Sequence, residues 1–358
     1  EITTLRGRAT GAFARVTAVG FSPGGDILAT ARAGQVELWD VSQQRKVATL
    51  QGPGSAYSVA FSPRGDHLAT VGYRSDVRIW DVDTRQQIAP LPGHASSVSS
   101  IAFSPDGGTL ASGHRDRTAK LWDVESRQEL ASLPGHTGWV SSVVFSRDGD
   151  TLVTGGDAGT IKAWDVPARR EIATLPEVKP TGRSTAFSPD GTTIASASGN
   201  DVKIWDLSAR QEVATLLGHA NTVSWVTFSP DGSVLASGSE DTTGRLWDVA
   251  ARHEIATLRG HADQIRPIAF SRDGATLATG GSRGTVKLWD VAAREEIATL
   301  RAHTSTVFTV AFSPDGGTLV TGGDGTAKLW DVQTQQQIAV LRGHTDRITS
   351  ADFSPSGA

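Results

Sequence analysis

Serine, histidine and aspartate recur together along this chain, in an arrangement that could supply a hydrolytic triad. In such a triad the histidine takes a proton from the serine, and the aspartate orients the imidazole ring. The recurring histidines, however, occupy the same place in a repeated segment, for example in Gly93-His94 and Gly218-His219. Residues copied into many segments are more typical of a structural network than of one active site, so we assign no catalytic residue.

Other patterns that could carry chemistry also have structural explanations. The tripeptide His114-Arg115-Asp116 matches the catalytic loop of protein kinases, but the chain lacks the kinase glycine loop and DFG motif. Glycine strings such as 155–159 are not followed by a helix that could bind phosphate at its N-terminus, so we interpret them as hairpin turns. No carboxylate spacing matches a calcium loop, and the chain has no cysteine. The sequence therefore predicts neither a metal site nor a cofactor.

Composition limits the classes of partner. The formal net charge is -4, whereas a protein that binds nucleic acid generally is strongly basic. No apolar run approaches the roughly 18 residues that a membrane span requires. The absence of cysteine fits a reducing compartment. We therefore expect a cytoplasmic, monomeric protein with no nucleic-acid or membrane partner.

The segment that positions these residues repeats with a period of 41 or 42 residues, which indicates one supersecondary unit copied many times. The clearest marker is a tryptophan–aspartate pair, and it occurs at Trp39-Asp40, Trp80-Asp81, Trp122-Asp123, Trp164-Asp165, Trp205-Asp206, Trp247-Asp248, Trp289-Asp290 and Trp330-Asp331.

Each unit is predicted to contain four short antiparallel strands, as residues 303–341 illustrate. Four runs rich in Val, Thr, Ile, Phe and Leu are separated by polar clusters. The string 313–316, Ser-Pro-Asp-Gly, is typical of a tight turn, because proline presets the backbone and glycine tolerates positive φ. No window shows helical periodicity, so the fold class is all-β.

The recurring Gly-His, FSPDG and Trp-Asp elements resemble the WD40 repeat over all 358 residues, with highly regular, bacterial-type repeats. The resemblance implies a β-propeller, most simply with eight blades of four strands. It also implies a buried network in which tryptophan bonds a second-strand hydroxyl, the hydroxyl bonds the loop histidine, and the histidine bonds an aspartate. Three repeats carry all four groups: His94, Ser112, Asp116 and Trp122; His219, Ser237, Asp241 and Trp247; His303, Thr321, Asp324 and Trp330.

The ends of the chain leave the blade count open. Complete blades span about 15–341, residues 1–5 form an extra fourth strand, and residues 343–358 form an extra first strand of one 1–358 domain. Residues 1–5 could replace the outer strand 338–341 of the last blade, or both end segments could remain spare. A seven-blade ring with one extra blade, or a fragment of a longer array, is the alternative.

The resemblance places partner binding on the loops that join fourth to first strands and on the turns between second and third strands. Three positions per blade should point there: six and four residues before the first-strand Phe, and the residue before the network aspartate. The biased side chains at these positions, here called the rim residues, are Arg15, Arg32, Tyr57, Tyr73, Arg115, Trp139, Asp157, Arg183, Glu240, Arg266, Phe308 and Arg347. Aromatic residues and arginine are enriched at interface hot spots. Trp225 lies one position away, and we expect it to point into its blade.

The leading hypothesis is a non-enzymatic scaffold or sensor that binds a protein or peptide on this rim, within a larger multidomain protein. In bacterial relatives such arrays often sit beside kinase, protease-like or NTPase domains. Rim arginines would favour an acidic or phosphorylated partner. One alternative is a structural or designed array without a dedicated partner, which predicts a uniform rim. The other is an enzyme with a central-channel site, which requires unpaired carboxylates or histidines there.

The repeats with incomplete networks predict softer blades. Repeats four and seven keep the histidine but have Ala158 and Arg283 at the aspartate position, and repeats one, two and five lack the histidine as well. Because a partly satisfied network stabilises less, residues 10–90 and 176–210 should exchange amide hydrogens faster than the other blades. Hydrogen exchange read by mass spectrometry measures this ranking, and the strongest protection in these segments would refute it.

Overall fold

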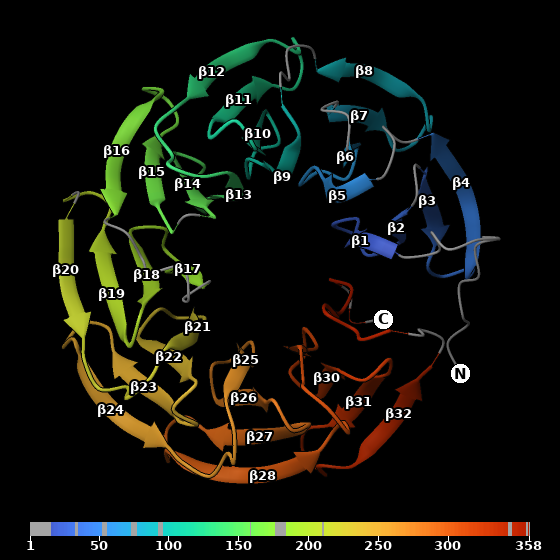
Figure 1. Ribbon diagram of the computed structural model, residues 1–358. Coiled ribbons are helices and arrows are strands. Elements are labelled where there is room, and N and C mark those ends of the chain that lie inside the picture. Colours follow the sequence, from blue (N-terminus) through green and yellow to red (C-terminus); the bar gives the residue numbers. More distant parts are fainter. Residues whose placement is uncertain are drawn as a thin grey trace. The chain divides into compact units, whose positions relative to one another are not determined.

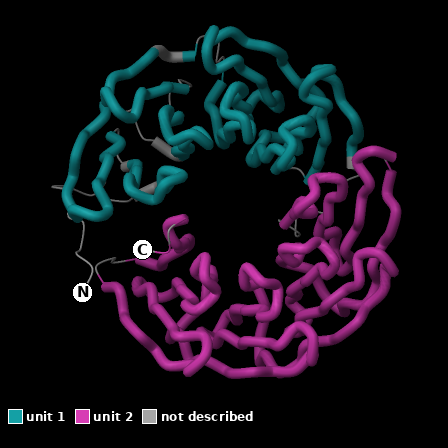
Figure 2. Tube along the Cα trace, turned by 180° about the vertical axis from the view of Figure 1, so that it is seen from behind, with its two compact units in different colours: residues 1–177 teal, residues 178–358 magenta. Residues whose placement is uncertain are grey.

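The computed structural model describes residues 16–32, 35–51, 56–72, 77–91, 96–157, 159–175, 184–209, 211–342, 346–355 and 357. Within these ranges there is no helix, and the strands form eight four-stranded antiparallel sheets. The chain divides into two compact units, residues 1–177 and 178–358 (Figure 2). The predicted all-β class and the eight sheets of four antiparallel strands are confirmed, consistent with eight propeller blades. We number the sheets as blades one to eight in chain order.

Unit 1 contains blades one to four, whose first strands β1, β5, β9 and β13 lie along the inner side of the unit (Figure 1). Its strands are β1 Val16–Phe21, β2 Ile27–Arg32, β3 Gln35–Asp40, β4 Arg45–Gln51, β5 Ala56–Phe61, β6 His67–Gly72, β7 Val77–Asp81, β8 Gln87–Leu91, β9 Val98–Phe103, β10 Thr109–His114, β11 Ala119–Asp123, β12 Glu129–Leu133, β13 Val140–Phe145, β14 Thr151–Gly156, β15 Ile161–Asp165 and β16 Arg170–Leu175.

Unit 2 contains blades five to eight in the same order, with β17, β21, β25 and β29 as first strands (Figure 1). Its strands are β17 Thr185–Phe187, β18 Thr193–Ser198, β19 Asp201–Asp206, β20 Gln211–Leu216, β21 Val223–Phe228, β22 Val234–Ser239, β23 Gly244–Asp248, β24 His253–Leu258, β25 Ile265–Phe270, β26 Thr276–Gly281, β27 Thr285–Asp290, β28 Glu295–Arg301, β29 Thr309–Phe312, β30 Thr318–Gly322, β31 Ala327–Asp331 and β32 Gln337–Leu341.

The apolar core lies between neighbouring blades of one unit. For example, Leu288 and Leu300 of blade seven pack with Leu319 and Trp330 of blade eight. All four side chains are buried. A four-stranded sheet has two apolar faces, so each blade needs a neighbour to remove its faces from water.

The third and fourth strands share an irregular register in every blade. The pairing shifts immediately before the tryptophan, as between Leu121 and Trp122. In blade three Lys120 Nζ lies 2.7 Å from a carboxylate oxygen of Glu129 on the fourth strand and 5.4 Å from the centre of the Trp122 ring. Such β-bulges re-aim side chains, and here the bulge coincides with a charge pair beside the tryptophan.

The FSPDG turns connect successive blades of a unit through proline and glycine. The turn glycine has positive φ, as Gly232 does at 77°, and a Cβ placed on it would lie 3.2 Å from Pro189 Cδ of the preceding blade. A Cβ placed on Gly316 of blade eight would have no atom within 4 Å. The preceding turn there carries Arg272 in place of proline.

The two chain ends differ in what the structure describes. Residues 1–5, which one closure of the ring requires, lie outside the described residues. Of 343–358, residues 346–355 and 357 are described and form no strand. The Ile348 amide donates to Gly323 O at 2.9 Å, and the Ala351 amide lies 3.3 Å from Thr309 Oγ1. This segment therefore lies against blade eight.

Arg272→Pro should stabilise the protein. The Gly274 amide donates to Ser271 O at 2.9 Å, as the Gly232 amide does to Ser229 O, so both turns have the same hydrogen bond. Proline at a compatible turn position adds about 0.4–1 kcal/mol by restricting the unfolded chain. Urea unfolding followed by fluorescence measures the gain. Arg272→Ala is the control for loss of the arginine, and a proline variant no more stable than this control would contradict the prediction.

Candidate functional site

Blade six contains the complete hydrogen-bond network. Trp247 Nε1 donates to Ser237 Oγ at 2.8 Å, and Ser237 Oγ lies 2.8 Å from His219 Nε2. The other ring nitrogen, His219 Nδ1, lies 2.8 Å from Asp241 Oδ2. Burial opposes ionisation of Asp241, but hydrogen bonds from Thr243, from a backbone amide and from His219 outweigh it and lower the pKa of Asp241 to about 2.

Blade eight repeats this geometry with threonine as the hydroxyl. Its contacts are 3.1 Å from Trp330 Nε1 to Thr321 Oγ1, 3.0 Å from Thr321 Oγ1 to His303 Nε2, and 3.0 Å from His303 Nδ1 to Asp324 Oδ1. The imidazole side chains of His303 and His219 are 0% and 1% exposed. A serine or threonine enclosed with its histidine in this way cannot reach a substrate, so this geometry holds the fold and is not a catalytic triad.

Blade four replaces the missing aspartate with a hydroxyl. His136 Nδ1 lies 2.8 Å from Thr160 Oγ1, and His136 Nε2 lies 2.6 Å from Thr154 Oγ1. Trp164 Nε1 donates to the same Thr154 at 2.8 Å. Burial among neutral partners, with Lys162 nearby, lowers the pKa of His136 to about 4.

Blade seven contains a carboxylate that the sequence pattern did not indicate. His261 Nε2 lies 2.8 Å from Thr279 Oγ1, and His261 Nδ1 lies 3.4 Å from Thr285 Oγ1. Burial is the main reason that the pKa of His261 falls to about 4. Both carboxylate oxygens of Asp263, two residues after this histidine, are buried without a hydrogen-bond partner. Asp263 therefore does not replace the network aspartate.

In blade three the histidine beside the second-strand serine is His114. Its Nε2 lies 2.8 Å from Ser112 Oγ, and Trp122 Nε1 donates to the same oxygen at 2.8 Å. His114 is fully buried, and burial lowers its pKa to about 4. Asp116 Oδ1 accepts instead from Thr118. The predicted partner of Ser112, His94, lies outside the described residues.

The neighbouring glycines explain how His114 fits. In blades four, seven and eight, a Cβ at the corresponding glycine would lie 2.7–2.9 Å from Nδ1 of the loop histidine; these glycines are Gly156, Gly281 and Gly323. A side chain at this position therefore occupies the same space as that ring. The sequence did contain a signal for the burial of His114. His114 stands two positions after the second-strand hydroxyl, where the blades with a described loop histidine have glycine or serine.

The remaining blades lack a described loop histidine. Trp39 and Trp80 still donate to second-strand threonines, at 3.0 Å and 2.9 Å. In blade five, Trp205 Nε1 and Ser196 Oγ are buried without hydrogen-bond partners. Blade five also has the shortest first strand, β17 with three residues.

Among the rim residues, seven have described side chains. Arg115, Trp139 and Asp157 belong to unit 1, and Glu240, Arg266, Phe308 and Arg347 belong to unit 2. The other five side chains lie outside the described ones: Arg15, Arg32, Tyr57, Tyr73 and Arg183.

In unit 1 the three described rim residues come together across the junction of blades three and four. The guanidinium carbon of Arg115 lies 4.6 Å from the centre of the Trp139 ring. Trp139 is 48% exposed, and its carbonyl accepts the Asp157 amide at 2.9 Å. Arg115 and Asp157 are also exposed. We call this row of a cation, an aromatic ring and an anion the Arg115–Trp139–Asp157 row.

Unit 2 has a second pair of this kind, in which the Arg347 guanidinium lies 5.4 Å from the centre of the Phe308 ring. Arg266 is exposed, and its Nη2 is 3.5 Å from Gln264 Oε1. The expectation that Trp225 points into its blade is wrong, because this side chain is 40% exposed.

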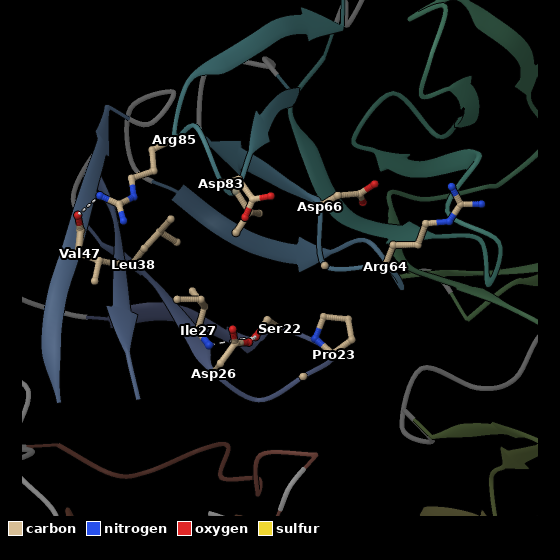
Figure 3. A pocket seen from close by; sticks show the side chains of 13 residues that line it. Ser22, Pro23, Asp26, Ile27, Leu38, Val47, Arg64, Asp66, Asp83 and Arg85 are labelled. Carbon is tan, nitrogen blue, oxygen red and sulfur yellow. Dashed lines mark hydrogen bonds between the residues drawn. The ribbon is translucent and has the colours of Figure 1, made fainter. Parts of the chain in front are cut away.

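A surface pocket of about 410 Å³ lies elsewhere in unit 1, between blades one and two (Figure 3). Asp26, Arg64, Asp66 and Arg85 contribute to its lining, and Arg85 Nη1 donates to a backbone carbonyl of blade one at 3.1 Å. An equivalent arginine contact joins Arg252 to blade five. Among the described residues no group of three His, Asp or Glu side chains could hold a metal ion. We therefore interpret the pocket as part of a blade junction.

The repeats match the WD40 family model, described as WD domain, G-beta repeat, at residues 1–40, 44–81, 85–123, 127–165, 182–206, 210–248, 252–290, 294–331 and 335–358. The crystal structure of the computationally designed Ika8 protein is similar, with a TM-score of 0.70 and 26% identity over 88% of this chain and 96% of that chain. Small ribosomal subunit protein RACK1 of Caenorhabditis elegans is 38% identical over 88 residues, 24% of this chain and 26% of that protein. The chain therefore matches about a quarter of this relative's length.

The buried histidines predict a loss of stability in acid. The pKa values of His114, His136 and His261 fall from 6.5 to about 4 on folding. Between these pH values the unfolded chain binds more protons than the folded chain. The contribution of these histidines to the free energy of unfolding is therefore fully present above pH 6.5 and is lost as the pH falls towards 4. Each histidine contributes about 3 kcal/mol at most.

Urea unfolding at several pH values measures this loss. In His136→Gln the free energy of unfolding should fall less steeply between pH 6.5 and 4 than in the wild type. Leu130→Ala removes packing without removing a titratable group and should keep the wild-type slope. An unchanged slope in His136→Gln would contradict the assignment.

Proposed function

The chain belongs to the WD40 repeat family, and on this premise we propose that it is a non-catalytic scaffold or sensor that binds another protein, or a peptide, through its rim residues. Members of this family typically act as interaction scaffolds. The proposal includes a monomeric, cytoplasmic module of a larger multidomain protein. Among the described residues no helix is long and apolar enough to cross a membrane.

The observation that carries the proposal is the stacking of arginine on aromatic rings at the rim. Arg115 lies on Trp139 in unit 1, and Arg347 lies on Phe308 in unit 2. Trp139 leaves nearly half of its surface in water. Tryptophan and arginine are the residue types that most often dominate binding energy at protein interfaces, and a stacked arginine has less side-chain freedom to lose on binding.

An enzymatic function has less support. The described histidines of the repeated network are enclosed by hydroxyls and aspartates of their own blades. Catalytic acids and bases need access to a substrate, and these groups lack it. The similarity to RACK1, a protein named as part of a ribosomal subunit, agrees with a role in an assembly.

A structural array without a dedicated partner is the second candidate, favoured by the similarity to a computationally designed protein. Such an array predicts a rim as uniform as the repeated frame. The rim instead varies from Trp139 and Arg115 in one half of the chain to Glu240, Arg266 and Phe308 in the other. This variation supports the binding function.

Affinity capture from lysate of the source cells should separate the two candidates. Three baits are compared. The first is the wild type, and the second is a rim variant with Trp139→Ala and Arg266→Glu. The third carries Val144→Ala and Arg272→Glu as matched changes away from the rim. A protein retained by the wild type and the control, but lost with the rim variant, would support rim binding. Equal capture by all three folded baits would favour the structural array.

A further inference from the structure

We propose that the Arg115–Trp139–Asp157 row binds an extended acidic–apolar–basic segment of a partner protein, with a carboxylate facing Arg115, an apolar side chain on Trp139 and a cation facing Asp157. This inference rests on the proposed rim-binding function and adds the chemistry of the bound segment.

Arg115 is the one described rim cation of unit 1, and it has no ion pair with a described carboxylate of this chain. By contrast, Lys120 lies 2.7 Å from Glu129 and Lys162 lies 2.8 Å from Glu171. The charge of Arg115 is therefore available to a carboxylate outside the chain. A guanidinium held against an aromatic ring keeps its N–H groups in one plane, where they can bind a carboxylate bidentately.

Trp139 supplies the apolar contact at the centre of the row. Its ring is 48% exposed even though Arg115 stacks on it. An exposed tryptophan next to a cation offers a partner both apolar area and a charge partner. Removing such an anchor commonly weakens binding at least tenfold.

Backbone hydrogen bonds hold the turns that carry Arg115 and Asp157. The Arg115 amide donates to Ser97 O at 3.0 Å, and the Asp157 amide donates to Trp139 O at 2.9 Å. Both bonds tie a turn to the start of a first strand, so the row is preorganised on the blades. Asp157 is exposed and has no ion pair with a described cation of this chain. The row therefore offers one unpaired cation and one unpaired anion beside Trp139, and a segment that carries both charges can satisfy both.

The two charges also distinguish this partner from a polyanion. Nucleic acid or an anionic membrane would bring negative charge to Asp157 as well as to Arg115, and that charge would be repelled at Asp157. A segment with an acid at one side and a base at the other satisfies both groups. A phosphorylated residue in place of the carboxylate is an outcome that the test can identify.

The test begins with selection of a displayed library of random 12-residue peptides on the full chain. The selected peptides are then synthesised, and their dissociation constants are measured by fluorescence anisotropy. Peptides of the proposed class should carry an apolar residue together with Asp or Glu and with Lys or Arg. Trp139→Ala and Arg115→Glu should each weaken binding by about tenfold or more. Arg147→Glu is the matched control, because Arg147 lies beyond the other end of β13 and undergoes the same charge change.

A charge swap distinguishes direct pairing from general weakening. A peptide whose acidic residue is changed to Lys should bind Arg115→Glu better than it binds the wild type. A phosphorylated serine at the acidic position that bound more tightly than glutamate would replace the carboxylate with a phosphate and overturn the proposed partner class.

The outcomes separate this inference from the function on which it rests. Peptides that require Trp139 but contain no acidic residue, or that bind Arg115→Glu as well as the wild type, would overturn the inference and leave rim binding supported. Peptides that ignore Trp139→Ala and Arg115→Glu would overturn the inference alone, whereas the absence of any selected peptide would count against both.

Discussion

The buried hydrogen bond from the third-strand tryptophan to a second-strand hydroxyl is the interaction on which every blade except blade five depends. It occurs in seven of the eight blades, from Trp39 with Thr30 to Trp330 with Thr321. In blades two to four and six to eight the tryptophan fills the junction with the preceding blade of its unit, so its single N–H must find an acceptor where water is excluded. The hydroxyl satisfies that N–H and, in blades four, six, seven and eight, links the middle strands to the loop histidine.

The space next to this hydroxyl limits what each blade can tolerate. A glycine two positions after the second-strand hydroxyl leaves space for the loop histidine in blades four, seven and eight. In blade three His114 stands at this position and fills the space. At Nδ1 of the loop histidine, aspartate is the partner in blades six and eight and threonine is the partner in blades four and seven. Outside blade five, the histidine partner can therefore change from blade to blade while the tryptophan N–H remains satisfied.

The repeat period and the turn strings were sufficient to predict the all-β class, the four-strand unit and the eight sheets, because they depend on local patterns repeated many times. The contacts of individual side chains were harder to predict. The sequence suggested only a kinase-like tripeptide at His114. Its burial was not predicted, because it depends on which ring fills a three-dimensional space. Trp225 was expected inside its blade, yet it is 40% exposed, and it lies where the register between β21 and β22 shifts. The contact of Arg115 with Trp139 crosses a blade junction, which a pattern read within one repeat does not represent.

The proline–glycine contact between successive turns has a consequence for cooperativity. An array in which each unit contacts only its neighbours behaves as a one-dimensional Ising chain, with one coupling term at each junction. The contact is present where Pro189 meets Gly232 and is missing where Arg272 precedes Gly316, so the coupling term is weaker between blades seven and eight. Blade eight can then fray as a separate sub-global opening while the other blades of unit 2 stay folded. This opening at the junction of blades seven and eight would be separate from the faster exchange expected for residues 176–210 in blade five.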